Sequence, residues 1–345
     1  MKRALFISIL LLMAAVAQAQ EVAAVTDPGQ TEKQLDRLEK IVEKLPSISG
    51  FVNLRYQYNG QTGANSFDVR RARLDLRGDI GRKVGYRLQV EFAGGPKILD
   101  AFVTWKICDY IGMQAGQFKI PFSLENPYSP TTLETMDNSL VITNLSGYSD
   151  VAGISANGRD IGLSFNGGFL KRDGFSIINW AAGVFNGAGI NRTDNNKQKD
   201  FSGMLTVNPI KSLSLAAYHY NGWGYRDIDG EGGNFRRIRS GSGARYDDGR
   251  WLARSEYIWG KTGELNSQGA YAVLGYMIRG KVQPVLKYDY WQRDLTDKGT
   301  RWNYYTAGVT YVPVKYCRLQ LNYSYRTSPG AKDYHYVGTQ VFGIF

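Results

Sequence analysis

The sequence of 345 residues is poor in the residue types that most catalytic and metal sites require. It has two histidines and two cysteines, Cys108 and Cys317, too few for a His/Cys metal cluster. It contains no G-x-S-x-G, no H-E-x-x-H and no glycine-rich phosphate loop. We therefore expect no enzyme activity, no catalytic residues, no cofactor and no metal ion.

Long hydrophobic runs are missing everywhere except at the N-terminus. The apolar run 4–16 follows Lys2 and Arg3 and is followed by Ala17-Gln18-Ala19. It is shorter than the ~20 residues of a transmembrane helix, and its flanks are those of a secretory signal peptide. We predict that residues 1–19 are removed. An exported chain does not meet cellular DNA, so the net charge of +11 does not indicate a nucleic-acid partner.

Residues 20–48 are predicted to form a periplasmic segment with one short helix at 31–45. Thr31 can cap this helix and Pro46 ends it. Its apolar residues have the spacing of a coiled coil but cover only two heptads, too few to be stable alone: Leu35, Leu38, Val42 and Leu45. Two interpretations remain open. The helix packs on the rest of the protein, or it pairs with copies of itself at the mouth of an oligomer.

From residue 49 onward the sequence is dominated by strict alternation. Val52, Leu54 and Tyr56 alternate with Asn53 and Arg55, and similar patterns recur along the chain. One face of each such segment is apolar and rich in tyrosine, while the other carries full charges. This arrangement is typical of a β-barrel in lipid, which has its apolar side outside and its polar side toward water.

The fold class predicted for 49–345 is all-β, a 16-stranded antiparallel transmembrane β-barrel. Most segments have about the 9–11 residues that a tilted strand needs to cross a bilayer. The predicted strands are 50–59, 69–78, 84–93, 98–107, 110–119, 159–167, 175–186, 199–208, 212–221, 237–247, 250–260, 268–279, 281–291, 301–312, 316–326 and 334–345.

The predicted connections alternate in length. Even-numbered ones are tight turns, whereas the odd-numbered set includes 120–158, 187–198, 222–236 and 292–300. Short periplasmic turns and longer external loops are typical of bacterial outer-membrane barrels. The chain ends in an alternating strand with Phe345 last, which resembles the assembly signal of such barrels.

Several segments resemble the phosphate-selective porin O/P family. The most specific is Gly116-Gln117-Phe118-Lys119-Ile120-Pro121-Phe122-Ser123-Leu124-Glu125, and the others are 70–74, 98–103, 183–187 and 283–289. The resemblance implies a 16-stranded barrel in the bacterial outer membrane, usually a homotrimer, with a lumen that favours anions. One departure concerns the lumen. Many relatives have an acidic-Arg-Ser run where this chain has Asp137-Asn138-Ser139, so a constriction arginine is missing.

The lumen of a 16-stranded barrel is wide unless loops narrow it. We expect the longest connection, 120–158, to fold inward and make the constriction, with Lys119 at its base near the narrowest point. The alternative is a solvated lid outside the barrel.

Alternation places a set of early arginines on the inner wall: Arg55, Arg71, Arg73, Arg77 and Arg87. Asp75, Glu91 and Asp100 lie among them. Two interpretations are open. The charges form salt bridges that brace the wall, or surplus arginines concentrate anions and pass them between weak sites.

A second basic cluster surrounds the predicted loop 222–236 and consists of Arg226, Arg236, Arg237 and Arg239, of which Arg226, Arg237 and Arg239 are assigned to the anion path. It either leans into the lumen or contacts anionic lipid headgroups outside. Tyrosines near strand ends are assigned to aromatic girdles on the lipid side, including Tyr218, Tyr220, Tyr257, Tyr288, Tyr304, Tyr305, Tyr323 and Tyr325.

The predicted function is passive diffusion of small anions, phosphate or a related solute, through a basic lumen. The alternative is a general or saccharide-admitting porin with braced walls and little anion selectivity. The expected partners are small anionic solutes, outer-membrane lipid and lipopolysaccharide, and two further copies of the chain in a homotrimer.

Overall fold

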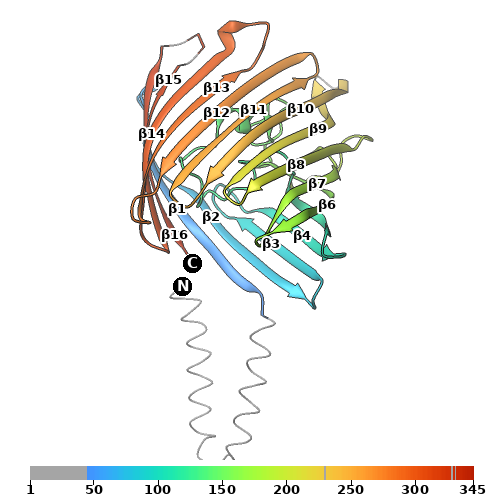
Figure 1. Cartoon of the computed structure of the whole chain (residues 1–345). Helices are drawn as coiled ribbons and strands as arrows, with labels where there is room; N and C mark the ends of the chain where they lie inside the picture. Colours follow the sequence, from blue (N-terminus) through green and yellow to red (C-terminus); the bar gives the residue numbers. More distant parts are fainter. Residues whose placement is uncertain (1–44, 229–230, 328, 331) are drawn as a thin grey trace, which may run out of the picture.

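The computed structural model describes residues 45–228, 231–327, 329–330 and 332–345 (Figure 1). The predicted signal peptide 1–19 lies outside these residues, and so does the predicted helix 31–45 apart from its last residue. The first eight strands are β1 (Ser47–Asn59), β2 (Asn65–Ile80), β3 (Val84–Glu91), β4 (Lys97–Lys106), β5 (Ile111–Lys119), β6 (Arg159–Arg172), β7 (Phe175–Phe185) and β8 (Asp200–Ile210).

The second half of the chain has eight further strands. They are β9 (Leu213–Ile228), β10 (Glu231–Asp247), β11 (Trp251–Thr262), β12 (Leu265–Tyr276), β13 (Val282–Gln292), β14 (Arg301–Val314), β15 (Cys317–Arg326) and β16 (Tyr334–Ile344). Two short helices lie in the connections, α3 (Leu140–Leu145) and the 3-10 helix η1 (Lys298–Thr300). No helix among the described residues is long and apolar enough to cross a membrane.

The strands form one closed barrel in which each pairs antiparallel with its sequence neighbours. Closure comes from β1 and β16, which pair from Phe51 opposite Ile344 to Asn59 opposite Tyr336. Each of the sixteen predicted segments overlaps one observed strand, so the predicted barrel is confirmed. Closure leaves no exposed sheet edge, which is the condition for a sheet to span a bilayer.

The two faces of the barrel wall differ as the alternation predicts. On β1, Val52 and Leu54 are 41% and 48% exposed on the outside, while Asn53 between them is fully buried and bonded to Gln340. Large exposed apolar side chains recur on the outer face of most strands. The outer surface therefore suits hydrocarbon.

The predicted external loop 222–236 is wrong for most of its length. β9 continues to Ile228 and β10 begins at Glu231, and the two pair through Arg236 opposite Trp223. The glycine at 222 indicates a turn by composition, but it serves packing. A Cβ there would lie 2.1 Å from Cγ of Asp200, so only glycine fits beside this buried carboxylate.

The tyrosine assignment holds only in part. Five of the tyrosines assigned to the girdles are exposed on the outside: Tyr257, Tyr288, Tyr305, Tyr323 and Tyr325. Tyr218 and Tyr220 are each 4% exposed and belong to an internal cluster, and Tyr304 lines an internal cavity. The alternation along β9 turns Tyr218 and Tyr220 inward, where apolar side chains of the described residues fill this part of the interior and leave no room for a water-filled channel.

Residues 120–158, here called the inner segment, run inside the barrel (Figure 1). Its helix α3 contacts β11, β12 and β13. Phe122, Val141, Ile142 and Leu145 form one apolar cluster with inward side chains of the wall: Tyr218, Tyr220, Ile258, Tyr271, Val273, Val285 and Trp291. The interior beside β9–β13 is thus filled like the core of a soluble domain.

Candidate functional site

The inner segment is fixed to the wall by a buried ion-pair network. Arg254 of β11 donates to Glu134 at 2.8 Å and to Glu125 at 3.3 Å. Glu125 also accepts from the backbone N–H and hydroxyl of Ser139, each at 2.7 Å. All three charged side chains are at most 4% exposed. Because a buried charge is costly without its partner, this network fixes where the inner segment lies.

A second attachment is made by β15. Arg318 donates to the carbonyl oxygens of Thr131 and Leu133, and Gln320 donates to those of Leu133 and Glu134 at 2.9 and 3.1 Å. The inner segment is therefore held on two sides of the barrel.

The remaining space forms a cavity of about 440 Å³, here called the lumen cavity, between the inner segment and the wall of β2 and β13–β16. Among the described residues that line it, four are cationic, Arg70, Arg71, Lys287 and Arg326, and two are acidic, Asp137 and Asp289. Most of the others are small, polar or aromatic: Thr135, Asn138, Thr143, Tyr148, Ser149, Ser155, Asn157, Tyr304, Thr306, Asn322, Ser324 and Tyr336.

A β-bulge brings two consecutive arginines into this cavity. Arg71 stands opposite Asn53, but the next pair is Val69 with Leu54, so Arg70 has no residue opposite it on β1. The extra residue of a bulge interrupts the in–out alternation and redirects a side chain. Arg70 therefore faces the interior beside Arg71, although strict alternation from Arg71 assigns it to the outside.

Asp137 lies between two arginines, Arg70 of β2 and Arg326 of β15, which stand on either side of the β1–β16 pair that closes the barrel. Arg70 Nη2 is 2.5 Å from its Oδ1, and Arg326 Nη2 is 3.4 Å from its Oδ2. Burial inside the barrel favours the neutral acid, but the charges of Arg70 and Arg326 outweigh it and hold the pKa of the Asp137 carboxyl well below its usual range. The side chain stays 40% exposed, so an ionised carboxylate faces the lumen cavity.

Four of the predicted wall arginines are paired with carboxylates. Arg55 pairs with Asp68 at 2.5 Å and Arg73 with Glu91 at 2.8 Å. Arg77 and Arg87 both bind Asp75, at 2.9 and 2.6 Å.

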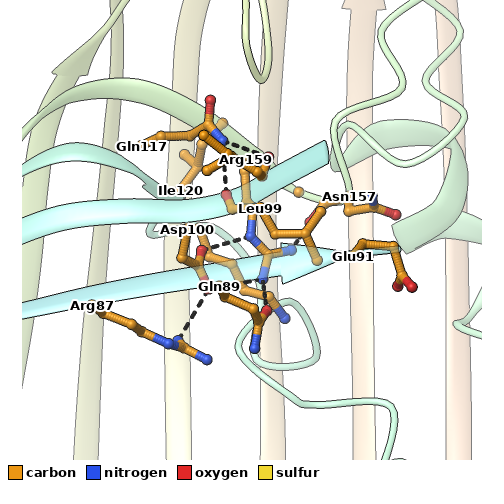
Figure 2. Close-up of polar contacts among 12 residues, drawn as sticks. Arg87, Gln89, Glu91, Leu99, Asp100, Gln117, Ile120, Asn157 and Arg159 are labelled. Atoms are coloured by element: carbon orange, nitrogen blue, oxygen red, sulfur yellow. Dashed lines mark hydrogen bonds and ion pairs between the residues drawn. The ribbon is translucent and has the colours of Figure 1, made fainter. Parts of the chain in front are cut away.

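Arg87 also reaches Asp100, which Arg159 holds from the other side at 2.7 Å (Figure 2). Paired charges cancel much of each other's field at a distance. These ion pairs connect β1, β2, β3, β4 and the start of β6.

Arg71 differs from the other predicted wall arginines. Its side chain donates to the amide oxygen of Asn53, at 3.4 Å. Among the described residues no carboxylate lies within ion-pair distance of it, so Arg71 is a cation without an ion-pair partner at the wall of the lumen cavity.

Lys119 lies under the inner segment and does not line the lumen cavity. Its Nζ donates to the carbonyl oxygens of Asn126 and Tyr128, at 2.5 and 2.7 Å. It thereby holds the first turn of the inner segment against β5.

The second basic cluster divides between two strands. Arg237 and Arg239 of β10 point inward and are 6% and 1% exposed. Arg237 contacts Asp200 at 3.2 Å and the hydroxyl of Tyr220, and Arg239 contacts Asp150 of the inner segment at 3.0 Å. Arg226 lies on β9 opposite Gly233.

Several charged residues of the site lie on late strands and were not among the predicted site residues. They are Lys287 and Asp289 on β13, Arg318 and Arg326 on β15, and Arg254 on β11. The same alternation rule, applied along 282–292 and 317–326, would have placed the first four on the inner wall.

Residues 47–221 match the family model of the phosphate-selective porins O and P. The chain belongs to this family. It is an outer-membrane porin, and the closed 16-stranded barrel agrees with that membership.

Solved porins of low sequence identity share the fold. An anion-selective porin from Comamonas acidovorans is 17% identical, with a TM-score of 0.65 over 87% of this chain and 99% of that one. The trimer form of OmpT, an outer-membrane protein of Vibrio cholerae, is 12% identical, with a TM-score of 0.61 over 87% of this chain and 99% of that one. An uncharacterised protein of Caulobacter vibrioides is 22% identical over 89% of this chain and 70% of its own length.

Proposed function

We propose that this porin lets small anions diffuse passively through the lumen cavity and that the inner segment is its constriction. The observation that carries the proposal is that Arg71 has no ion-pair partner among the described residues and lines a cavity where four cations face two carboxylates. Arginine remains charged at any physiological pH and binds oxyanions through its planar fork, so phosphate is a suitable cargo. The likeness to a porin described as anion-selective supports the proposal.

Cations of the barrel wall take the place of the loop arginine that the resemblance to the family leads one to expect. Here Asn138 occupies that place and lines the lumen cavity. Two wall arginines, Arg70 and Arg326, share the single carboxylate of the neighbouring Asp137, so these three groups together keep one positive charge in place of the loop arginine. Cationic surfaces that bind weakly at several points favour both entry and release of an anion.

A general or saccharide-admitting porin is the second candidate. The braced pairs favour it, because Arg55, Arg73 and Arg87 have carboxylate partners and contribute little net field. The two functions differ in the sign and size of ion selectivity.

The deciding measurement is the reversal potential of the purified porin in a planar bilayer across a KCl gradient. We expect chloride to be more permeant than potassium by severalfold, and phosphate to reduce the chloride current. A preference for potassium would reject the anion proposal. Absence of selectivity together with liposome swelling in neutral saccharides would favour the general porin.

We also propose that the porin is a homotrimer that associates through the outer face of β15, β16, β1 and β2. This face has an apolar groove of about 520 Å³ lined by Leu54, Val69, Leu319, Thr339 and Val341. Phe67 at its border is 85% exposed. The trimer form of OmpT, an outer-membrane protein of the same fold, supports this assembly. Lipid and lipopolysaccharide would cover the remaining outer surface.

Replacing Phe67 by glutamine is expected to weaken trimer association by at least about tenfold, because a buried aromatic side chain contributes about 1.5–3 kcal/mol. Light scattering of the detergent-solubilised protein across a dilution series measures the trimer fraction. Leu286→Gln is the matched control, since Leu286 is 63% exposed on the outer face of β13. Equal behaviour of the two variants would place the interface elsewhere.

A further inference from the structure

Two arginines hold opposite oxygens of one carboxylate in the lumen cavity, and each is also positioned by other groups. Arg70 donates to the carbonyl oxygen of Met136 at 2.9 Å and to Gln340 at 3.3 Å. The guanidinium of Arg326 lies over the rings of Tyr304 and Tyr336, 4.6 and 3.8 Å from their centroids. Both cations therefore keep their places without Asp137.

The residue between them belongs to a well-anchored stretch of chain. Lys287 Nζ and the hydroxyl of Thr135 donate to the carbonyl oxygen of Asp137, at 3.3 and 3.0 Å. The backbone N–H groups of Ser139 and Leu140 donate to Glu125 and Asp289. The backbone at 137 is thus fixed, while the carboxylate itself is 40% exposed and can rotate away.

We propose that Arg70 and Arg326 form a binding site for small organic carboxylates along the pore. The carboxylate of Asp137 occupies this site as a tethered ligand, and a permeating solute displaces it. This inference rests on the proposed anion-conducting function and names its substrate class. Two guanidinium groups that approach the two oxygens of a carboxylate are the usual recognition of that group.

The surroundings favour an organic acid over inorganic phosphate. The rings of Tyr304 and Tyr336 flank Arg326, and Met136 and Leu140 also line the lumen cavity. Such side chains give an apolar contact for the carbon skeleton of a solute whose carboxylate lies on the arginines. An inorganic oxyanion gains nothing from them.

A tethered competitor explains how the site can bind and still release. Two arginines that converge on one carboxylate would hold it more tightly than a single arginine such as Arg71, and without a competitor they would slow its passage. Asp137 lies on the same chain at a high effective concentration, so it returns to the arginines as the solute leaves. The charges of Arg70 and Arg326 keep the pKa of Asp137 low, so the competitor is ionised at neutral pH.

Asp137→Asn tests the proposal because it removes the competing charge and keeps the shape of the side chain. Succinate and benzoate are added to the porin in a planar bilayer, and the concentration that halves the chloride current is measured. We expect this concentration to fall by about tenfold relative to wild type, since hydrogen bonds to charged groups are among the strongest that proteins make. For inorganic phosphate, the concentration that halves the chloride current should fall less than for either carboxylate.

Asp289→Asn is the control, because Asp289 lines the same cavity and its removal changes the net charge by the same amount. The amide oxygen of asparagine can still accept the backbone N–H of Leu140, so the anchor of the segment around Asp137 is kept. This variant should become more anion-selective without the tenfold gain in block. The double variant Asp137→Asn/Arg326→Gln should lose the gain. Heat-dependent gel mobility establishes that each barrel is folded.

The outcomes separate the two proposals. Equal gains in block for Asp137→Asn and Asp289→Asn would overturn the tethered-ligand inference while leaving anion conduction intact, since a change in field alone would explain both. A larger gain for phosphate than for succinate would overturn the assignment to organic acids. A wild-type preference for potassium would reject the proposed function itself.

Discussion

Replacement of Arg254 by leucine is expected to widen the pore and raise its single-channel conductance. Arg254 is 3% exposed and binds both Glu125 and Glu134 of the inner segment. Its loss leaves two carboxylates in a packed interior, and removing one partner of a buried ion pair typically costs about 3–5 kcal/mol. The barrel has its own closed hydrogen-bond ladder, so we expect the inner segment to leave the wall before the strands separate.

The result is measured as conductance in KCl and as heat-dependent gel mobility. We expect at least a doubling of conductance with the folded barrel retained. Arg245→Leu is the control, because Arg245 stands directly opposite Arg254 on β10 but forms its ion pair with Asp247, at 2.6 Å, outside the inner segment. It meets the inner segment through the ring of Tyr128, 5.9 Å from its guanidinium, and forms no ion pair there among the described residues. An unchanged conductance of Arg254→Leu would mean that the contacts of Arg318 and Gln320 hold the inner segment without it.

The barrel follows from the sequence because water and lipid act on opposite faces of one wall. Val52 and Asn53 differ in polarity for that reason, and the period of two is then visible along most strands. The rule is weaker beside the inner segment. Val285 points into the apolar cluster and Leu286 points outward, so both faces of this part of β13 are apolar. The same packing explains why Tyr218 and Tyr220 lie inside.

The candidate site was predictable in its residue types but not in its pairs. Alternation placed Arg71 on the inner wall and missed Arg70, since a bulge depends on how two strands pair and leaves no mark in composition. The pairing of Arg254 with Glu134 was harder to predict, because the two residues are 120 positions apart in the sequence and meet only when the inner segment folds inward. Which arginines are braces and which face solute is therefore a property of the tertiary structure.

Arg71→Glu is expected to remove most of the anion preference. The variant changes the formal charge of the lumen cavity by two units, from four cations and two carboxylates to three of each among the described residues that line it. Unit charges about 4 Å apart interact by about 1 kcal/mol even in water, so we expect the ratio of chloride to potassium permeability to fall by about fivefold, to near one. The reversal potential in a KCl gradient measures this ratio.

Arg77→Glu provides the comparison on the same strand and the same face. Arg77 is 57% exposed, it does not line the lumen cavity, and its partner Asp75 keeps Arg87 when it is lost. We expect a shift of less than about twofold, because exposed charges at a distance are screened by salt. Arg71→Gln should fall between wild type and Arg71→Glu, since it removes one unit of charge. A graded series of this kind requires that permeating ions pass within reach of Arg71. Equal ratios for all the variants would instead place the path along another part of the wall and leave Arg71 as a structural contact of Asn53.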